Sequence, residues 1–285
     1  MAFDELLGNL RLTATEQTIA SQRVSHVQSF FLRNYVVAKA PWTIGSYGRE
    51  TIIRPRRDVD MMVALDVATY WDRYQGDSAR FLYWLRDALN AEYSNTQVST
   101  KQVAVRMLLG SDLQVDLVPT FARTGGGFLM PDGHSGWQAT NPPYHDDLMA
   151  SANVRTNSQL KPLVRLMKAW NHVNGKHLRS FHLEMVVAKV WENANGSLGT
   201  TAHAVTETLR CGGSWIRNPM MDPWAGSGAR LDDYLAADLR ASVARTLDED
   251  AGRAAAALAY EESGRIADAF ERWGVVFNRT FPAYG

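Results

Sequence analysis

Two aspartates that follow a glycine-serine turn are the residues of this chain best suited to chemistry. The turn is Gly45-Ser46, and the aspartates lie in the β-like run Arg57-Asp58-Val59-Asp60-Met61-Met62-Val63. Because side chains alternate between the two faces of a strand, Asp58 and Asp60 point to the same side. Paired carboxylates suit Mg²⁺, and the backbone N–H groups and hydroxyl of the turn suit a triphosphate. The combination indicates nucleotidyl transfer.

A third carboxylate, Asp116, lies inside the apolar run 113–119 and is expected on a neighbouring strand. An isolated buried aspartate costs several kcal/mol, on the order of 2–7, unless it is paired or binds a metal. Asp112 is the competing candidate, but it stands beside Gly110-Ser111 and is more simply explained as a turn residue. A sheet that presents Asp58, Asp60 and Asp116 together would hold two Mg²⁺ ions, or Mn²⁺, about 3.5–4 Å apart.

The composition excludes several classes of protein. Thirty basic and thirty acidic residues cancel, whereas proteins that grip duplex nucleic acid carry a basic excess. A small nucleotide substrate is therefore favoured, with no obligatory nucleic acid. The single cysteine, Cys211, excludes an internal disulfide and a multi-cysteine zinc site. No apolar run approaches the roughly 20 residues of a membrane span, and the first residues do not resemble a signal peptide, so we expect a cytoplasmic protein without a membrane partner.

Hydrophobic spacing divides the chain into a mixed half and a helical half. The first half predicts helices and strands, and the second predicts helices only. The expected helices cover 14–39, 78–91, 157–175, 180–194, 199–210, 232–247 and 250–273, and the expected strands include 101–109 and 113–119. A loop-rich stretch, 123–143, separates the halves. We therefore predict an α+β fold with an N-terminal domain over 1–143 and a helical domain over 144–285.

Four arginines form a local basic cluster beside the predicted site: Arg49, Arg54, Arg56 and Arg57. Such a cluster would attract triphosphates toward the cleft. Alternatively, it forms a solvated rim that pairs with Glu50 and Asp66.

Several motifs resemble a known enzyme family. The stretches 45–51, 58–60 and 115–119 resemble the nucleotidyltransferase superfamily that includes DNA polymerase β. Three later stretches, 141–145, 160–171 and 179–184, are similar to bacterial CD-NTases, the cGAS/DncV-like enzymes of anti-phage (CBASS) signalling. The resemblance implies a bilobed nucleotidyltransferase fold, in which a mixed β-sheet catalytic lobe and a helical lobe enclose the active site in the cleft between them. It also implies synthesis of cyclic di- or trinucleotides, or short linear oligonucleotides, from nucleoside triphosphates.

The resemblance assigns roles in the first lobe. Gly45 and Ser46 would hold the triphosphate, and Asp58, Asp60 and Asp116 would be the catalytic metal ligands.

It assigns three further nucleotide-binding residues in the second lobe. Lys168 would reach the β- and γ-phosphates; the alternative is a surface lysine at the end of an apolar stripe. Ser180 would contact phosphate. Phe181 would stack on the donor base, a contact worth about 1–3 kcal/mol, or would belong to the core.

The resemblance also bears on partners. CBASS partner proteins are expected, including a conjugating enzyme that could act at Gly285, unless that glycine is simply a terminus. Two other functions stay open: a template-independent transferase that makes linear oligonucleotides or extends an RNA end, and a nucleotide-binding scaffold that has lost catalysis. Base choice, product ring size and oligomeric state stay open as well.

Overall fold

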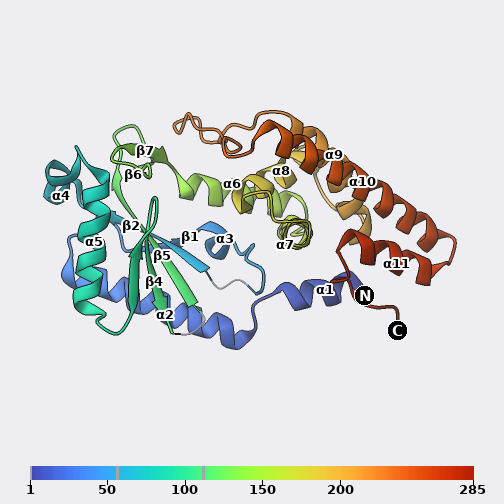
Figure 1. Cartoon of the computed structure of the whole chain (residues 1–285), viewed down its shortest axis with the longest axis horizontal. Coiled ribbons are helices and arrows are strands. Elements are labelled where there is room, and N and C mark those ends of the chain that lie inside the picture. Colours follow the sequence, from blue (N-terminus) through green and yellow to red (C-terminus); the bar gives the residue numbers. More distant parts are fainter. Residues whose placement is uncertain (1, 56–57, 111–112) are drawn as a thin grey trace.

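The computed structural model describes residues 2–55, 58–110 and 113–285 and shows two lobes side by side (Figure 1). The sheet lobe contains the described strands, and the helical lobe contains α6 to α11 together with the N-terminal helix α1. The predicted α+β bilobed fold is confirmed. Within these ranges, every helix is too short or too polar to cross a membrane.

A mixed seven-stranded sheet forms the centre of the sheet lobe. Its strands are β1 (Trp42–Ile44), β2 (Asp58–Leu65), β3 (Gln97–Thr100), β4 (Val105–Leu109), β5 (Leu113–Ala122), β6 (Phe128–Pro131) and β7 (Trp137–Thr140). The order is β1-β2-β5-β4-β3, with β6 paired to β5 and β7 to β6. Only β2 and β5 pair in parallel among the described strands. A parallel pair needs a crossover connection, which here carries two helices and the β3–β4 hairpin.

Helices cover one face of this sheet. They are α2 (Ala14–Asn34), α4 (Val67–Tyr74) and α5 (Ser78–Glu92), and the short helix α3 (Gly45–Gly48) follows β1. α2 begins in a capping box, in which Thr13 and Glu16 satisfy each other's backbone N–H groups. Its buried residues recur at helical spacing and pack with Phe81 of α5 and Val59 of β2 into one core. This core packs against one face of β2 and β5 and fixes their position.

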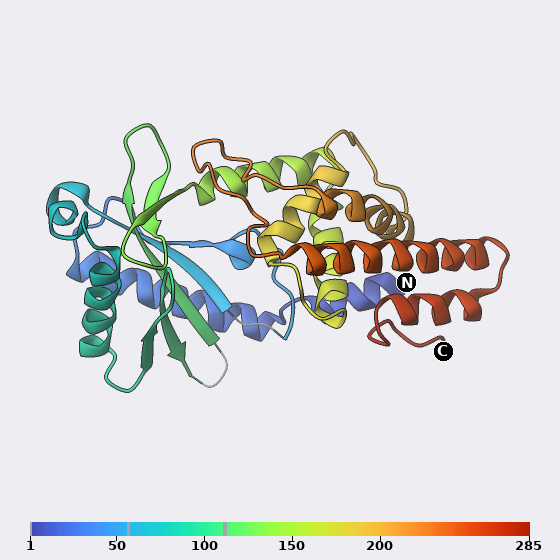
Figure 2. The ribbon, with the colours of Figure 1, turned by 45° about the horizontal axis from the view of Figure 1, so that its top comes forward.

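The helical lobe has a separate core. Its helices are α1 (Ala2–Leu10), α6 (Pro142–Arg155), α7 (Leu160–Val173), α8 (Ser180–Val190), α9 (Thr201–Arg217), α10 (Ala237–Glu262) and α11 (Ile266–Val276). Although α1 comes first in the chain, it packs against α7 of this lobe, and its N-terminal end reaches α11 (Figure 2). The Phe3 ring lies 4.9 Å from the rings of both Trp273 and Phe281. The two ends of the chain therefore pack into the same core.

The structure differs from the predicted elements at several points. α2 ends at Asn34 rather than near residue 39, because the backbone becomes extended at Tyr35. The predicted strand over 101–109 is a turn followed by β4, with the Lys101 N–H donating to Ala104 O at 2.7 Å. The predicted break near residue 249 is absent and α10 continues to Glu262, while the chain turns at Gly264, whose φ is +77°. α1 and α4 were not predicted.

The aromatic contacts of α1 give a first prediction. Phe3→Ala should destabilise the protein by about 3–5 kcal/mol, the usual cost of removing a buried phenylalanine side chain. Urea unfolding measures the effect, with Leu32→Ala on the exposed face of α2 as the control, since Leu32 is 54% exposed. A loss below about 1 kcal/mol for Phe3→Ala would show that α1 does not belong to the core.

Candidate active site

The Gly45-Ser46 turn lies directly against the aspartates of β2. β1 ends at Ile44, directly before this turn, and Ile44 is the register partner of Asp60. Gly45 has a φ of +65°, a left-handed conformation that favours glycine. A Cβ atom at this position would lie 2.2 Å from Oδ2 of Asp60. Glycine is therefore required twice, by its backbone conformation and by the close approach of the carboxylate.

The sheet brings the three predicted carboxylates together. Asp58 and Asp60 are both partly accessible on β2, while Val59 between them is buried. In the parallel β2–β5 pair, Asp60 is the register partner of Asp116. Asp112, the competing candidate, lies outside the described residues, as do Arg56 and Arg57 of the basic cluster.

One carboxyl group of this site, that of Asp60, has an unusually high pKa, and burial is the main cause. Burial raises the pKa of Asp60 to about 7, and the charges of Asp58 and Asp116 act in the same direction. The cations Arg49 and Arg106 oppose the shift but do not cancel it. Asp60 therefore takes up a proton near neutral pH, because it is desolvated and lies near two other carboxylates.

Arg106 on β4 provides a local positive charge. It faces Asp116 across the antiparallel β4–β5 pair and donates to both carboxylate oxygens, at 2.7 and 2.5 Å. The pKa of Arg106 is raised chiefly by these hydrogen bonds. Arg106 thus holds Asp116 in one orientation.

The residues fit a divalent cation. As placed, no three His, Cys, Asp or Glu side chains of the described ranges surround one metal position. The donor set is nevertheless all carboxylate, which Mg²⁺ and Mn²⁺ prefer. The pKa of Asp60 is raised first by burial and then by the charges of Asp58 and Asp116, so a bound cation would stabilise its ionised form.

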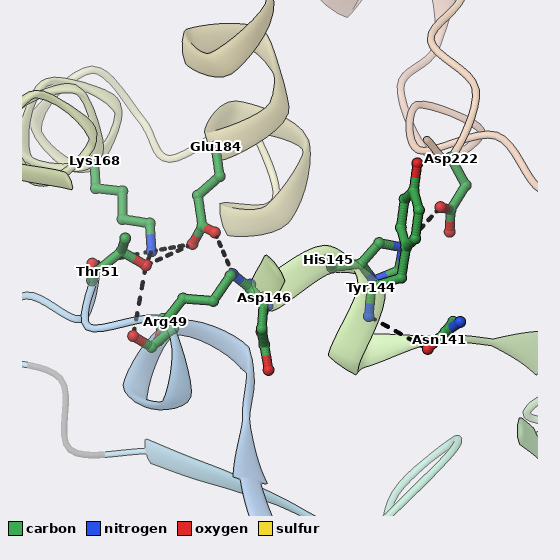
Figure 3. Close-up of polar contacts among 10 residues, drawn as sticks. Arg49, Thr51, Asn141, Tyr144, His145, Asp146, Lys168, Glu184 and Asp222 are labelled. Carbon is green, nitrogen blue, oxygen red and sulfur yellow. Dashed lines mark hydrogen bonds and ion pairs between the residues drawn. The ribbon is translucent and has the colours of Figure 1, made fainter. Parts of the chain in front are cut away.

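A buried polar cluster joins the two lobes next to the turn (Figure 3). Arg49 donates from Nε to Glu184 at 2.6 Å and from Nη1 to Asp146 at 3.3 Å. Lys168 lies in the same cluster, with its ammonium group 2.5 Å from Glu184 Oε1. Burial opposes ionisation of Glu184, but the two cations outweigh it and its pKa is lowered.

Ser180 begins α8 and lines a basic cavity of about 450 Å³ at the lobe junction. The basic side chains around this cavity are Arg54, Lys168, His172, Lys176, His177 and Arg179, and no described carboxylate lines it. Such a lining suits a polyphosphate.

The Phe181 ring lies next to the Arg49 side chain. The guanidinium of Arg49 lies 5.0 Å from the centre of the Phe181 ring, and the His145 ring packs on it at 4.6 Å. Nε2 of His145 is in turn 2.8 Å from Asp222 Oδ1, in the segment between α9 and α10 (Figure 3). Phe181 is partly buried and contacts both of these side chains.

The comparisons with known proteins decide the family. The family model "Second Messenger Oligonucleotide or Dinucleotide Synthetase domain" (SMODS) matches residues 1–153. The chain belongs to the SMODS family. The matched residues include the turn and the three aspartates described above. The predicted relationship to the CD-NTases is confirmed.

Individual relatives of this SMODS protein agree with that assignment. It is 35% identical over 158 residues to the cyclic AMP-AMP-AMP synthase of an Acinetobacter species, an alignment that covers 51% of this chain but 44% of the relative. It is 24% identical over 276 residues to a Bacillus cereus protein named "Probable cyclic nucleotide synthase", covering 84% and 81% of the two chains. CdnC of E. coli MS115-1, solved with a HORMA protein, superposes with a TM-score of 0.78 at 17% identity, covering 99% and 96%. CdnC with ATP gives a TM-score of 0.76 at 16% identity, covering 99% and 98%.

Sequence reasoning did not find several residues of this site. Arg106 was assigned to a strand, and its alternation with buried Val105 and Met107 was the only local signal that it faces the site. Glu184 ends the stretch 179–184 but was assigned no role there, and Asp146 lies just outside the stretch 141–145. Their place at the site follows from contacts with Arg49, from which they are 135 and 97 positions away.

The pKa of Asp60 gives a second prediction. Because its pKa is higher in the folded state than its model value of 3.8, protonated Asp60 favours folding, and this contribution is lost as pH rises from about 4 to 7. The metal-free protein should therefore lose thermal stability between pH 5 and 8, and the loss should be smaller in Asp60→Asn. Each kcal/mol corresponds to about 2–4 °C at this chain length. Equal pH slopes for the two proteins would contradict the assigned pKa.

Proposed function

We propose that this chain is a nucleotidyltransferase that joins nucleoside triphosphates into a cyclic di- or trinucleotide and releases pyrophosphate. The observation that carries the proposal is the placement of Asp60 beside both Gly45 and Asp116 in a SMODS protein. A nucleotide-binding scaffold that has lost catalysis does not need three carboxylates close together beside the Gly45-Ser46 turn. The cyclic products named for the relatives support the same reaction class.

In this proposal the residues of the site have the following roles. The turn amides and the Ser46 hydroxyl hold the triphosphate, and Ser180 contacts it from the helical lobe. Asp58, Asp60 and Asp116 would hold two Mg²⁺ or Mn²⁺ ions. When bound, these ions supply activation of the attacking ribose hydroxyl and neutralisation of the leaving pyrophosphate. Arg106 keeps the Asp116 carboxylate oriented.

Phe181 would offer its remaining ring surface to the donor base. Its ring already contacts Arg49 and His145, so little side-chain entropy is lost on stacking. A second transfer within the same site would then close the ring of the product.

Protein partners form a separate part of the proposal. The complex of CdnC with a HORMA protein supports a protein partner for this chain as well. Conjugation at Gly285 stays a prediction; Phe281 packs in the helical core, whereas Tyr284 is 59% exposed.

Pyrophosphate release tests the proposed reaction. The purified protein with the four ribonucleoside triphosphates and Mg²⁺ should release pyrophosphate. Asp58→Asn combined with Asp60→Asn should lower the rate by more than about 100-fold, beyond the 10–100-fold typical of outer-shell groups. Asp87→Asn is the matched control, because Asp87 is an exposed helix residue paired with Arg86. Pyrophosphate release at the wild-type rate by the double variant would remove the aspartates from the reaction.

A further inference from the structure

The segment between α9 and α10, residues 218–236, forms an arm that reaches from the helical lobe to the sheet lobe. Its first part is a narrow hairpin, in which the Leu231 N–H donates to Met220 O and the Asp222 N–H donates to Ala229 O, each at 2.9 Å. The tip of the arm extends toward β6 and β7 (Figure 1). The arm therefore has a defined backbone conformation of its own.

The tip of the arm is anchored on the turn between β5 and β6. A Cβ atom added at Gly127 would lie 2.5 Å from Cη2 of Trp224, so the indole packs directly on this glycine. Gly127 has a φ of +70°, which favours glycine as well. Arg123 donates from Nη1 to Gly226 O at 3.3 Å. The arm is thus a second connection between the lobes, in addition to the cluster around Glu184.

Next to its tip, the arm holds His145 through Asp222. Oδ1 of Asp222 accepts from the Trp224 N–H at 2.8 Å and lies 2.8 Å from Nε2 of His145 (Figure 3). Burial opposes ionisation of Asp222, but its hydrogen bonds with His145 and with the Trp224 N–H outweigh burial and lower its pKa. An ionised carboxylate only accepts hydrogen bonds, so Nε2 of His145 carries the proton. One carboxylate oxygen therefore holds both the turn of the arm and the His145 ring.

The His145 ring connects the arm to Phe181. The two ring centres lie 4.6 Å apart with an angle of 47° between the planes, within the range in which aromatic rings attract each other. His145 is only 6% exposed, whereas Phe181 is partly accessible. Contacts therefore run from Asp222 through His145 to the ring that is proposed to stack on the donor base.

The other end of the arm contacts the start of α8 directly. The Tyr234 hydroxyl accepts from the Arg179 N–H at 2.7 Å and lies 3.0 Å from Nδ1 of His182. The Arg179 guanidinium lies 4.2 Å from the centre of the Tyr234 ring. Arg179 and His182 flank Ser180 and Phe181 in the sequence. Both ends of the arm thus converge on the two residues that α8 is proposed to contribute to nucleotide binding.

We infer that the arm is a positioning element of the nucleotide site, in which Asp222 and His145 hold the Phe181 ring in the orientation that stacks on the donor base. The inference rests on the proposed function and adds two residues that act through Phe181. A ring that is already held in place loses little conformational freedom when the base binds. The contribution of Asp222 and His145 should therefore appear as affinity for the base and not for the phosphates.

Two probes separate the base from the phosphates in a calorimetric binding experiment with Mg²⁺. They are the α,β-methylene analogue of ATP, which cannot release pyrophosphate, and tripolyphosphate, which has no base. Asp222→Ala and His145→Ala should each raise the Kd of the analogue about 3–10-fold and leave that of tripolyphosphate within about twofold, as for coupling between contacting residues. Asp222→Asn keeps an acceptor for His145 and should recover most of the loss.

A double-mutant cycle shows whether His145 acts through Phe181. Phe181→Ala should raise the Kd of the analogue by about 5–150-fold, the range for a base-stacking contact. His145→Ala should add less than about twofold in that background, because the ring it holds is gone. Independent losses that multiply in the double variant would overturn the inference. So would wild-type affinity for the analogue in the single variants, or equal losses for the analogue and tripolyphosphate.

Asp268→Ala is the matched control for the loss of a carboxylate. Asp268 pairs with Arg265 at the surface of α11, at the other end of the helical lobe, and its removal should change neither Kd (Figure 1). The melting temperature of each variant checks that the protein stays folded. Because binding is measured without turnover, a wild-type protein that binds as described but releases no pyrophosphate would count against the proposed function alone. A wild-type protein that binds both probes equally tightly would overturn the inference alone.

Discussion

The parallel pairing of β2 with β5 is the constraint on which this site depends. It makes Asp60 and Asp116 register neighbours, with Asp58 two residues before on the same face. Desolvation and like charge then raise the pKa of Asp60 to about 7. Carboxylates arranged in this way would gain stability from the cation proposed above, because carboxylate oxygens prefer a hard cation.

The second constraint is the burial of Glu184 between the lobes. A desolvated carboxylate demands compensation, and it obtains this from Arg49 of the sheet lobe and Lys168 of the helical lobe. The same contacts fix the position of the segment that follows the Gly45-Ser46 turn. These ion pairs therefore fix the two lobes relative to each other at the place where a nucleotide would contact both.

Sequence patterns predicted the strand positions of the aspartates better than they predicted which side chains contact one another. The alternation of Asp58 and Asp60 is local information, and β2 places them as expected. The buried run around Asp116 predicted a strand correctly, because its apolar neighbours need a sheet. The pairing of Arg106 with Asp116 depends on the β4–β5 register, which hydrophobic spacing alone does not specify. Likewise, α1 could not be placed in the helical core, because its partners Trp273 and Phe281 are some 270 residues away.

One measurement tests the central claim most directly, because it identifies the product itself. The purified protein is incubated with all four ribonucleoside triphosphates and Mg²⁺ or Mn²⁺, treated with phosphatase, and its products are weighed by mass spectrometry. The account predicts a phosphatase-resistant cyclic oligonucleotide, whose mass gives the bases and the ring size. Only phosphatase-sensitive linear products, or extension of an added RNA end, would contradict cyclisation and assign the site to a different transfer.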